Sequence, residues 1–319
     1  MKLAVLIRRR PLLVLVTVSL FLCVSAVVQL SAETARYTTT ATATATRHLV
    51  YAAGQRPVTT LPLRPEEQRN KTYNEIRIRV SRPSNDSPRL KSPGRWDHSQ
   101  HGQSRSVDDH LRHRQNGFFI ESGASDGETG SNTLFFERHR NWTGLLVEAN
   151  PQLYRQLLDK RRRAYAINAC VSPSRRPISA VFKLAGWIGG LAHKMSKGHL
   201  ALVNRHGVGD INVTCYPIND IVAALSIDHI DYWSLDVEGA ELAILRSVVW
   251  ATMPPVDVIS VEYMVKGANG KRDQRASDKK LQRIQQLFKQ TGIYQQIGIK
   301  NNVDVIFTRI HKRLRNARN

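Results

Sequence analysis

The sequence predicts an α/β fold built on a mostly parallel, twisted β-sheet that is closed by an antiparallel hairpin. Three observations predict it. From residue 117 onward, short apolar runs alternate with longer stretches of helical periodicity. Glycine, proline and other turn residues separate these segments. The last two apolar runs, 294–299 and 303–308, are joined only by the tripeptide Lys-Asn-Asn, which is typical of a hairpin.

The individual strands and helices follow from these patterns in chain order. Expected strands cover residues 118–120, 144–147, 164–168, 178–184, 213–216, 232–237, 256–261, 294–299 and 303–308. Expected helices cover residues 131–139, 152–162, 218–225, 240–249 and 278–290. A helix between two strands favours parallel pairing, because parallel strands need a long crossover connection. We therefore expect one folded domain over 117–310, followed by a basic tail at 311–319.

The N-terminal region has a different character. Three arginines at 8–10 precede residues 11–30, which contain no charged side chain and can cross a bilayer core of roughly 30 Å as a helix. The arginines favour a cytoplasmic tail at 1–10 and a type II signal anchor at 11–32. A cleaved signal peptide is the alternative, because small residues around 24–26 resemble a cleavage site.

Both interpretations place the rest of the chain in the secretory lumen. With the anchor, the protein is expected to be a single-pass membrane protein of the endoplasmic reticulum or Golgi, or further along at the endosome or plasma membrane. Residues 33–116 are rich in Thr, Ala, Arg, Pro, Ser and Gln and show no lasting apolar periodicity. So little apolar surface does not offset the entropy of ordering the backbone. We therefore predict a disordered luminal stalk over 33–116.

Cysteines and glycosylation sequons fit a luminal domain. Cys170 and Cys215 are the two cysteines of the predicted domain, and an even pair in an oxidising compartment suggests one disulfide. Two separately buried thiols are the alternative. Sequons at Asn70, Asn141 and Asn212 are candidate N-glycosylation sites.

The chain of 319 residues carries a formal net charge of +21, with Lys and Arg in both halves. Such an excess invites a nucleic-acid interpretation, but no zinc-finger spacing and no basic strand interleaved with aromatic residues occurs. We therefore expect no nucleic-acid partner. A basic surface facing acidic glycans, phospholipid or solvent accounts for the charge, and residues 266–280 are expected to form a solvated charged loop. The sequence leaves the oligomeric state open.

The strongest local signal is the segment 118–127, Phe-Phe-Ile-Glu-Ser-Gly-Ala-Ser-Asp-Gly, an apolar strand that runs into a turn of small residues. Open α/β sheets bind nucleotides at the carboxyl ends of such strands, and small residues let the backbone approach a ligand closely. The turn carries Glu121 and Asp126, which are unsuited to a pyrophosphate but suited to a cationic ligand. This favours S-adenosylmethionine, whose amino group and sulfonium are both positive, over NAD or ATP.

Glu148 directly follows the next expected strand. An acidic residue about 20 residues past the glycine turn, at the end of the second strand, accepts hydrogen bonds from ribose hydroxyls. Glu148 has this position relative to Gly123. The alternative is an acidic helix cap before Pro151.

Further carboxylates lie at the end of the expected strand 232–237. Because that strand neighbours the first one in the expected sheet, Asp236 would point into the crevice and orient or deprotonate an acceptor hydroxyl. Glu238 is a second catalytic candidate, and Glu262 would border the acceptor pocket. His193, in a glycine-containing connection, is a third candidate base, with a merely solvated histidine as the alternative. No spacing of His, Cys or Asp indicates a metal site.

Four blocks in order resemble the FkbM-type methyltransferase family: residues 119–127, 147–150, 168–172 and 235–241. The resemblance covers roughly Gly117 to Arg309. It implies a Rossmann-like class I methyltransferase fold, S-adenosylmethionine as cofactor, and O-methyl transfer to a hydroxyl. With the expected luminal topology, the acceptor is expected to be a glycan or secreted molecule.

The resemblance also implies roles by position. Glu121, Gly123 and Asp126 would hold the methionine portion of the cofactor. Glu148 would hold the ribose and Asn168 the adenine edge, with Asp236 at the reaction zone. The full implied set of cofactor-binding residues is Glu121, Gly123, Ser125, Asp126, Gly127, Glu148, Ala149, Asn150, Asn168 and Asp236.

A membrane anchor followed by a luminal domain of this kind is also similar to the animal Star family, whose namesake assists export of EGF-receptor ligands from the endoplasmic reticulum. That resemblance implies a second function, in which the domain handles growth-factor cargo without catalysis, because function belongs to the site and not to the fold.

Overall fold

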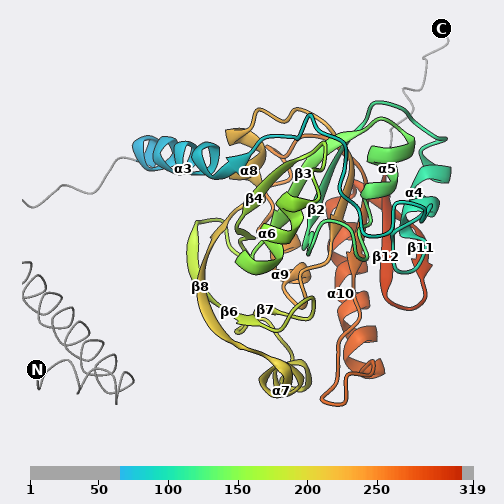
Figure 1. Ribbon diagram of the computed structural model, residues 1–319. Helices are drawn as coiled ribbons and strands as arrows, with labels where there is room; N and C mark the ends of the chain where they lie inside the picture. The colour runs from blue at the N-terminus through green and yellow to red at the C-terminus, as the bar shows by residue number, and fades with distance from the viewer. Residues whose placement is uncertain (1–64, 311–319) are drawn as a thin grey trace, which may run out of the picture. The chain divides into compact units, whose positions relative to one another are not determined.

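The computed structural model describes residues 65–310, and elements are numbered as in Figure 1. The predicted cytoplasmic tail, signal anchor and basic C-terminal tail lie outside the described residues. Within 65–310, no helix combines the length and the apolar character that a bilayer crossing demands.

The centre of the domain is a mixed eight-stranded sheet of order β1-β4-β3-β2-β9-β10-β12-β11. Its five central strands β4, β3, β2, β9 and β10 run parallel to one another, whereas β1 pairs antiparallel with β4 and β12 pairs antiparallel with β10 and with β11. The bounds of the strands are β1 Val80–Ser81, β2 Phe118–Ser122, β3 Thr143–Glu148, β4 Tyr165–Asn168, β9 Ile230–Leu235, β10 Val256–Glu262, β11 Tyr294–Lys300 and β12 Asp304–Arg309. The predicted α/β fold with a closing hairpin is confirmed.

Helices cover both faces of this sheet (Figure 1). The strands β9 and β10 are buried along their whole length, as expected for parallel strands covered on both sides. Neighbouring residues point to opposite faces, so Tyr232 packs into one apolar core and Trp233 into the other. One core includes side chains of α4 (Gln103–His110), α5 (Leu134–His139) and α6 (Pro151–Asp159); the other includes those of α3 (Pro65–Arg79), α8 (Ile218–Ala224), α9 (Glu241–Ser247) and α10 (Gln274–Thr291).

A second, four-stranded sheet of order β5-β8-β6-β7 stands beside the first and was not expected. It contains β5 (Cys170–Val171), β6 (Ile178–Leu184), β7 (Gly190–Leu191) and β8 (Gly209–Tyr216), with α7 (Lys197–His206) between β7 and β8. Figure 1 shows this sheet and α7 below the main sheet. The disulfide between Cys170 and Cys215, which joins β5 to β8, confirms the predicted pairing.

The prediction of a disordered stalk is wrong for residues 65–116; residues 33–64 lie outside the described part. Ile76 of α3 and Val107 of α4 are fully buried, one in each core, and β1 extends the main sheet by pairing with β4. Between them, the segment 82–102 is tied to the domain by hydrogen bonds of its backbone and polar side chains. Residues 65–116 have few apolar side chains, and buried ones such as Ile76 and Val107 lie far apart in the sequence.

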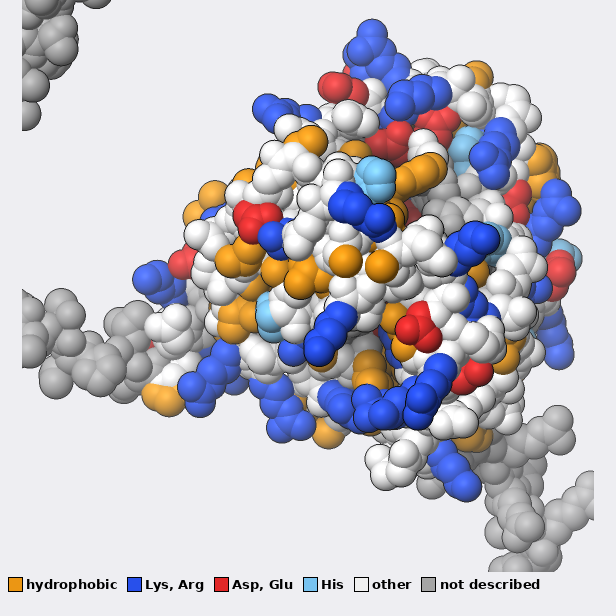
Figure 2. All heavy atoms as spheres, turned by 90° about the horizontal axis from the view of Figure 1, so that it is seen from below, with side chains coloured by type: hydrophobic (Ala, Val, Ile, Leu, Met, Phe, Trp, Pro, Cys, Tyr) orange, Lys and Arg blue, Asp and Glu red, His pale blue; other side chains and the backbone are white. Residues whose placement is uncertain are grey.

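On the face seen in Figure 2, Lys and Arg side chains form a short run below the centre and are otherwise scattered among apolar and acidic ones. The three sequon asparagines Asn70, Asn141 and Asn212 are all exposed. Their positions are open to modification, and their glycosylation stays a prediction.

Candidate functional site

A cavity of about 600 Å³ lies at the carboxyl ends of the parallel strands. Its wall includes Gly123 after β2, Glu148 at the end of β3, Asp236 after β9 and Glu262 at the end of β10. The small sheet closes another side, where Phe182 and Leu191 line the cavity. Carboxyl strand ends are where open α/β sheets bind ligands. The three acidic residues on which the sequence argument rested, Glu121, Glu148 and Asp236, therefore share one cavity.

The glycine turn after β2 sets the shape of this cavity. Gly123 has a φ of 87°, and a Cβ placed on it would meet the backbone oxygen of Asp236 at 1.7 Å. The turn is held by hydrogen bonds from the amides of Gly123 and Ala124 to the carbonyl of Val147. The amide of Asp236 donates to the carbonyl of Ser122 at 3.1 Å. Only glycine lets the ends of β2 and β9 lie this close together.

We expect Gly123→Ala to lower the free energy of unfolding by roughly 3 to 5 kcal/mol, because the new methyl group collides with backbone that has no room to move. The matched control is Gly292→Ala, which also has a positive φ, 63°, but has no atom within 4 Å of the added Cβ. The control should lose only about 1 kcal/mol. Denaturant titration of both variants measures the difference, and equal losses would show that the close approach at Gly123 is unimportant.

Glu148 is buried at the end of β3, with its carboxylate held by two backbone amides. Ser125 N–H and Asn150 N–H each donate to it at 2.7 Å. Burial raises the pKa of Glu148 to about 7, although these amides favour the ionised form. Ala149, beside it, also lines the cavity, as does Ser125. A buried carboxylate at this strand end can accept hydrogen bonds from a pair of ribose hydroxyls.

Glu121 lines the cavity, but its carboxylate is used within the protein. It accepts hydrogen bonds from Ser131 Oγ at 2.8 Å, from the amide of Asn132 at 2.6 Å, and from Thr133 Oγ1 at 2.7 Å. Burial raises the pKa of Glu121. The residue therefore fixes the loop that leads into α5 and shapes the cavity. The expected direct contact with the methionine portion is not favoured by this geometry.

Four other predicted contacts lie behind the cavity wall: Asp126, Gly127, Asn150 and Asn168 are absent from the lining. The Asp126 carboxylate accepts hydrogen bonds from the amides of Glu128 and Thr129 and closes the turn. Asn150 caps α6 by accepting from Gln152 and Leu153. The Asn168 side chain donates to the carbonyls of Glu148 and Ala149. The positional roles given to these four residues are therefore corrected: they position the loops that form the wall.

Asp236 carries a carboxylate that the described residues leave unpaired at this site. Within residues 65–310, no hydrogen bond to its carboxylate is formed. Burial and the nearby charges of Glu262 and Glu238 raise the pKa of Asp236 well above its ordinary value. A half-buried carboxylate with a raised pKa, facing a cavity, has the properties of a general base.

Lys266 compensates the negative charge around Asp236. Its ammonium contacts the two carboxylate oxygens of Glu238 at 2.7 and 2.5 Å and that of Glu262 at 3.5 Å. The pKa of Glu238 is raised to about 8, chiefly by burial, and the pKa of Lys266 is raised by its carboxylate neighbours. Carboxylate oxygens of Asp236, Glu238 and Glu262 approach one another within 4.8 Å, so the three acidic residues expected around the acceptor pocket do lie together.

The interpretation of 266–280 as a solvated loop is wrong at both its ends. Lys266 belongs to the acidic cluster, and Lys280 of α10 is buried with its ammonium 2.6 Å from the Glu241 carboxylate. Glu241 in turn accepts from the amides of Val237 and Gly239 and holds the turn after β9. Local composition did not reveal these residues, because their partners lie on other elements.

The connection between β6 and α7 covers part of the cavity, with Trp187, Ile188 and Gly189 in its wall. His193 is exposed and is not part of the lining, so its catalytic assignment is corrected. His199 is the buried histidine of this region: its Nε2 lies 2.9 Å from the carbonyl of Ile188 and 3.7 Å from Glu238. The sequence around His199 does not indicate a buried side chain, because only the first turn of α7 brings it inward.

The model of the methyltransferase FkbM domain matches residues 121–281 of the chain. The chain belongs to the FkbM methyltransferase family. The matched region of this FkbM-family protein begins at Glu121 and contains the glycine turn, Glu148, Asp236 and Lys266. Segment 65–120 lies outside it. Membership of this family implies S-adenosylmethionine as the methyl donor. The comparison with curated proteins found no match to the chain.

Solved structures similar to this FkbM-family chain include methyltransferase FkbM from Methylobacillus flagellatus, at 13% identity and a TM-score of 0.37. That likeness covers 60% of this chain and 43% of the other, so the chain spans under half the length of that protein. A human methyltransferase 10 domain containing protein is similar at 10% identity, covering 77% and 97%, with a TM-score of 0.34. A methyltransferase from Aquifex aeolicus is similar at 7% identity, covering 75% and 98%, with a TM-score of 0.35. Likenesses of this degree carry no argument about substrate.

Proposed function

We propose that this FkbM-family protein is an S-adenosylmethionine-dependent O-methyltransferase that acts in the secretory lumen on a hydroxyl of a glycan or another secreted molecule. The observation that carries the proposal is the unpaired carboxylate of Asp236 in the same cavity as the amide-held carboxylate of Glu148.

The residues present fit the methyl donor. The cavity of about 600 Å³ has room for a small nucleoside and an acceptor group. Its walls offer the Glu148 carboxylate for ribose hydroxyls and apolar side chains such as Val171 and Ile244 for a flat base. Two buried polar atoms of cavity-lining residues, Asn132 Oδ1 and His98 Nδ1, have no partner within the described chain, which leaves them available to a ligand.

When bound, the cofactor supplies an electrophilic methyl group on a positive sulfur. Asp236 would accept the proton of the acceptor hydroxyl, and its raised pKa suits that exchange near neutral pH. The Lys266 ammonium contacts Glu238 and Glu262 beside it and favours their ionised forms, although burial still raises the pKa of Glu238 to about 8. Trp187 and its neighbours cover the cavity and would limit the access of water.

The disulfide between Cys170 and Cys215 supports the luminal part of the proposal, because disulfides persist in oxidising compartments. A secreted or membrane-bound hydroxyl compound is the acceptor that such a compartment offers. The signal anchor remains a proposal on the sequence of 11–32.

Calorimetric titration of the full-length chain with S-adenosylmethionine tests the proposal. We expect Glu148→Gln to weaken the affinity about 10- to 100-fold, since a charge-assisted acceptor is lost. Affinity of the unmodified chain should also fall as the pH is lowered through 7, because ligand hydroxyls need the ionised carboxylate and the pKa of Glu148 is about 7. The variant should lose this pH dependence.

Glu66→Gln, at an exposed position of α3, is the matched control and should bind as the unmodified chain does. Unchanged affinity of Glu148→Gln would remove Glu148 from the ligand site. Failure of the unmodified chain to bind, together with growth-factor cargo that co-purifies from cells, would instead favour the cargo-handling function.

A further inference from the structure

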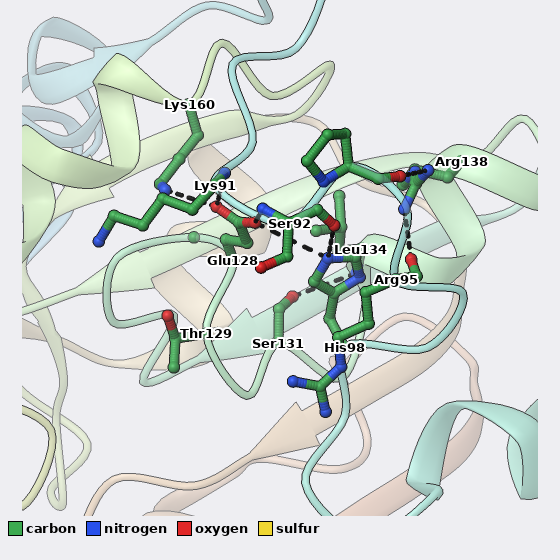
Figure 3. A network of polar contacts seen from close by, with 12 residues as sticks. Lys91, Ser92, Arg95, His98, Glu128, Thr129, Ser131, Leu134, Arg138 and Lys160 are labelled. Atoms are coloured by element: carbon green, nitrogen blue, oxygen red, sulfur yellow. Dashed lines mark hydrogen bonds and ion pairs between the residues drawn. The ribbon is translucent and has the colours of Figure 1, made fainter.

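The segment Lys91 to Gln100, here called the strap, passes beside the cavity although it lies outside the region matched by the FkbM family. Glu128, which is 2% exposed, anchors it. The amides of Lys91 and Ser92 donate to the Glu128 carboxylate at 2.7 and 2.6 Å, and the ammonium of Lys160 lies 2.5 Å from the same group. Figure 3 shows these contacts converging on Glu128.

The strap is held along its length as well. Arg138 of α5 donates to the carbonyls of Pro93 and Arg95 at 2.6 and 2.7 Å (Figure 3). Ser99 forms a backbone bridge with Gly130, in the loop that follows the glycine turn. The strap therefore has a defined conformation against the cofactor loop, and its side chains at 95, 98 and 100 line the cavity.

Arg95 is a cation of the cavity wall that has no counter-ion among the described residues. Its guanidinium contacts only the backbone carbonyls of Asp97, at 2.7 Å, and Ser99, at 3.5 Å. Within residues 65–310, no carboxylate pairs with it. The second cation in the wall, the ammonium of Lys266, is already paired with Glu238 and Glu262. Arg95 is thus available to a negative group of a ligand.

His98, on the same strap as Arg95, offers a hydrogen-bond acceptor. Its ring is 1% exposed, with Nε2 3.3 Å from the carbonyl of Ser92 and 3.8 Å from the Glu128 carboxylate, and Nδ1 has no partner. Burial lowers the pKa of His98; Glu128, Arg95 and Arg138 are the charged groups that face it. A neutral ring that donates through Nε2 keeps the lone pair of Nδ1 as an acceptor.

We propose that the strap binds the zwitterionic amino-acid end of the methyl donor, with the Arg95 guanidinium pairing with the carboxylate and His98 Nδ1 accepting from the ammonium. This rests on the proposed function. It fills the gap left by Glu121 and Asp126, whose carboxylates are used within the protein and are not free for that end of the ligand.

Binding of two nucleosides can be compared to test this subsite independently of the rest of the cavity. S-adenosylhomocysteine carries the amino-acid end, whereas 5′-methylthioadenosine has the same adenosine and sulfur but lacks it. In calorimetry with the full-length chain, we expect Arg95→Gln to weaken S-adenosylhomocysteine about 10- to 100-fold and to leave 5′-methylthioadenosine within about twofold. His98→Leu should show the same selectivity, and His98→Asn, which keeps an acceptor near the Nδ1 position, should restore part of the affinity.

Arg155→Gln, at an exposed position of α6, is the control and should bind both nucleosides normally. Retained 5′-methylthioadenosine binding shows that each variant is folded. An equal loss of both nucleosides in Arg95→Gln, or no loss of either, overturns the strap subsite. An unmodified chain that binds neither nucleoside contradicts the proposed function itself, so the two failures are distinguishable.

Discussion

Asp236→Asn is expected to lower the rate of methyl transfer by about 10² to 10⁴-fold while the affinity for S-adenosylmethionine changes little. The substitution keeps the size of the side chain and removes its ability to take a proton, and general-base catalysis contributes an effect of this size. Because the Asp236 carboxylate forms no hydrogen bond within residues 65–310 and the substitution leaves the backbone unchanged, the variant should remain folded.

The rate is measured as transfer of labelled methyl groups to luminal glycans and proteins in cells that carry either form of the chain. Asp228→Asn, at an exposed position before β9, is the matched control. Since burial and the neighbouring carboxylates raise the pKa of Asp236, activity should be lost on acidification at a higher pH than an ordinary aspartate would allow. A variant as active as the unmodified chain would remove Asp236 from the chemistry.

Removal of everything before residue 117 is expected to unfold the domain. The fragment 117–319 loses Ile76 and Val107 from the two cores, and burial of each such side chain is worth about 1.5 to 3 kcal/mol. It also leaves buried polar groups without partners, at about 1 to 3 kcal/mol each. Asp304, which accepts from Gln103 at 2.6 Å, is one of them. The sum is comparable with the whole stability of a domain, about 5 to 15 kcal/mol.

Thermal unfolding of purified 33–319 and 117–319 measures this loss. We expect a cooperative transition only for the longer fragment. A shorter fragment with the same transition temperature would show that α3, the strap and α4 are dispensable and that the domain does begin near residue 117.

The main sheet could be predicted from sequence because its signal is local. Buried parallel strands are recognisable as apolar runs such as 256–261. The residues that follow such strands lie at the same edge of the sheet, the one formed by the carboxyl ends, however the helices pack. That rule placed Glu148 and Asp236 in the same cavity. The second sheet was missed, because a run such as 178–184 looks the same whichever sheet it joins.

Roles of single polar residues could not be read in the same way, because they depend on partners far away in the chain. In the sequence Glu128 is an ordinary acidic loop residue, and its contacts with Lys91, Ser92 and Lys160 are formed only in the tertiary fold. Lys266 likewise lies in a charged stretch typical of a solvated loop, and only the tertiary fold brings it into contact with Glu238. The composition of 33–116 averaged over the few apolar residues that dock on the domain, so it predicted disorder where α3 and α4 form.

The central claim is that the cavity at the carboxyl ends of β2, β3 and β9 holds the methyl-donor nucleoside. The most direct measurement is an experimental structure of the chain with S-adenosylhomocysteine. We predict ribose hydroxyls on the Glu148 carboxylate and the sulfur facing Asp236. A nucleoside bound elsewhere, or with its ribose away from Glu148, would contradict the account.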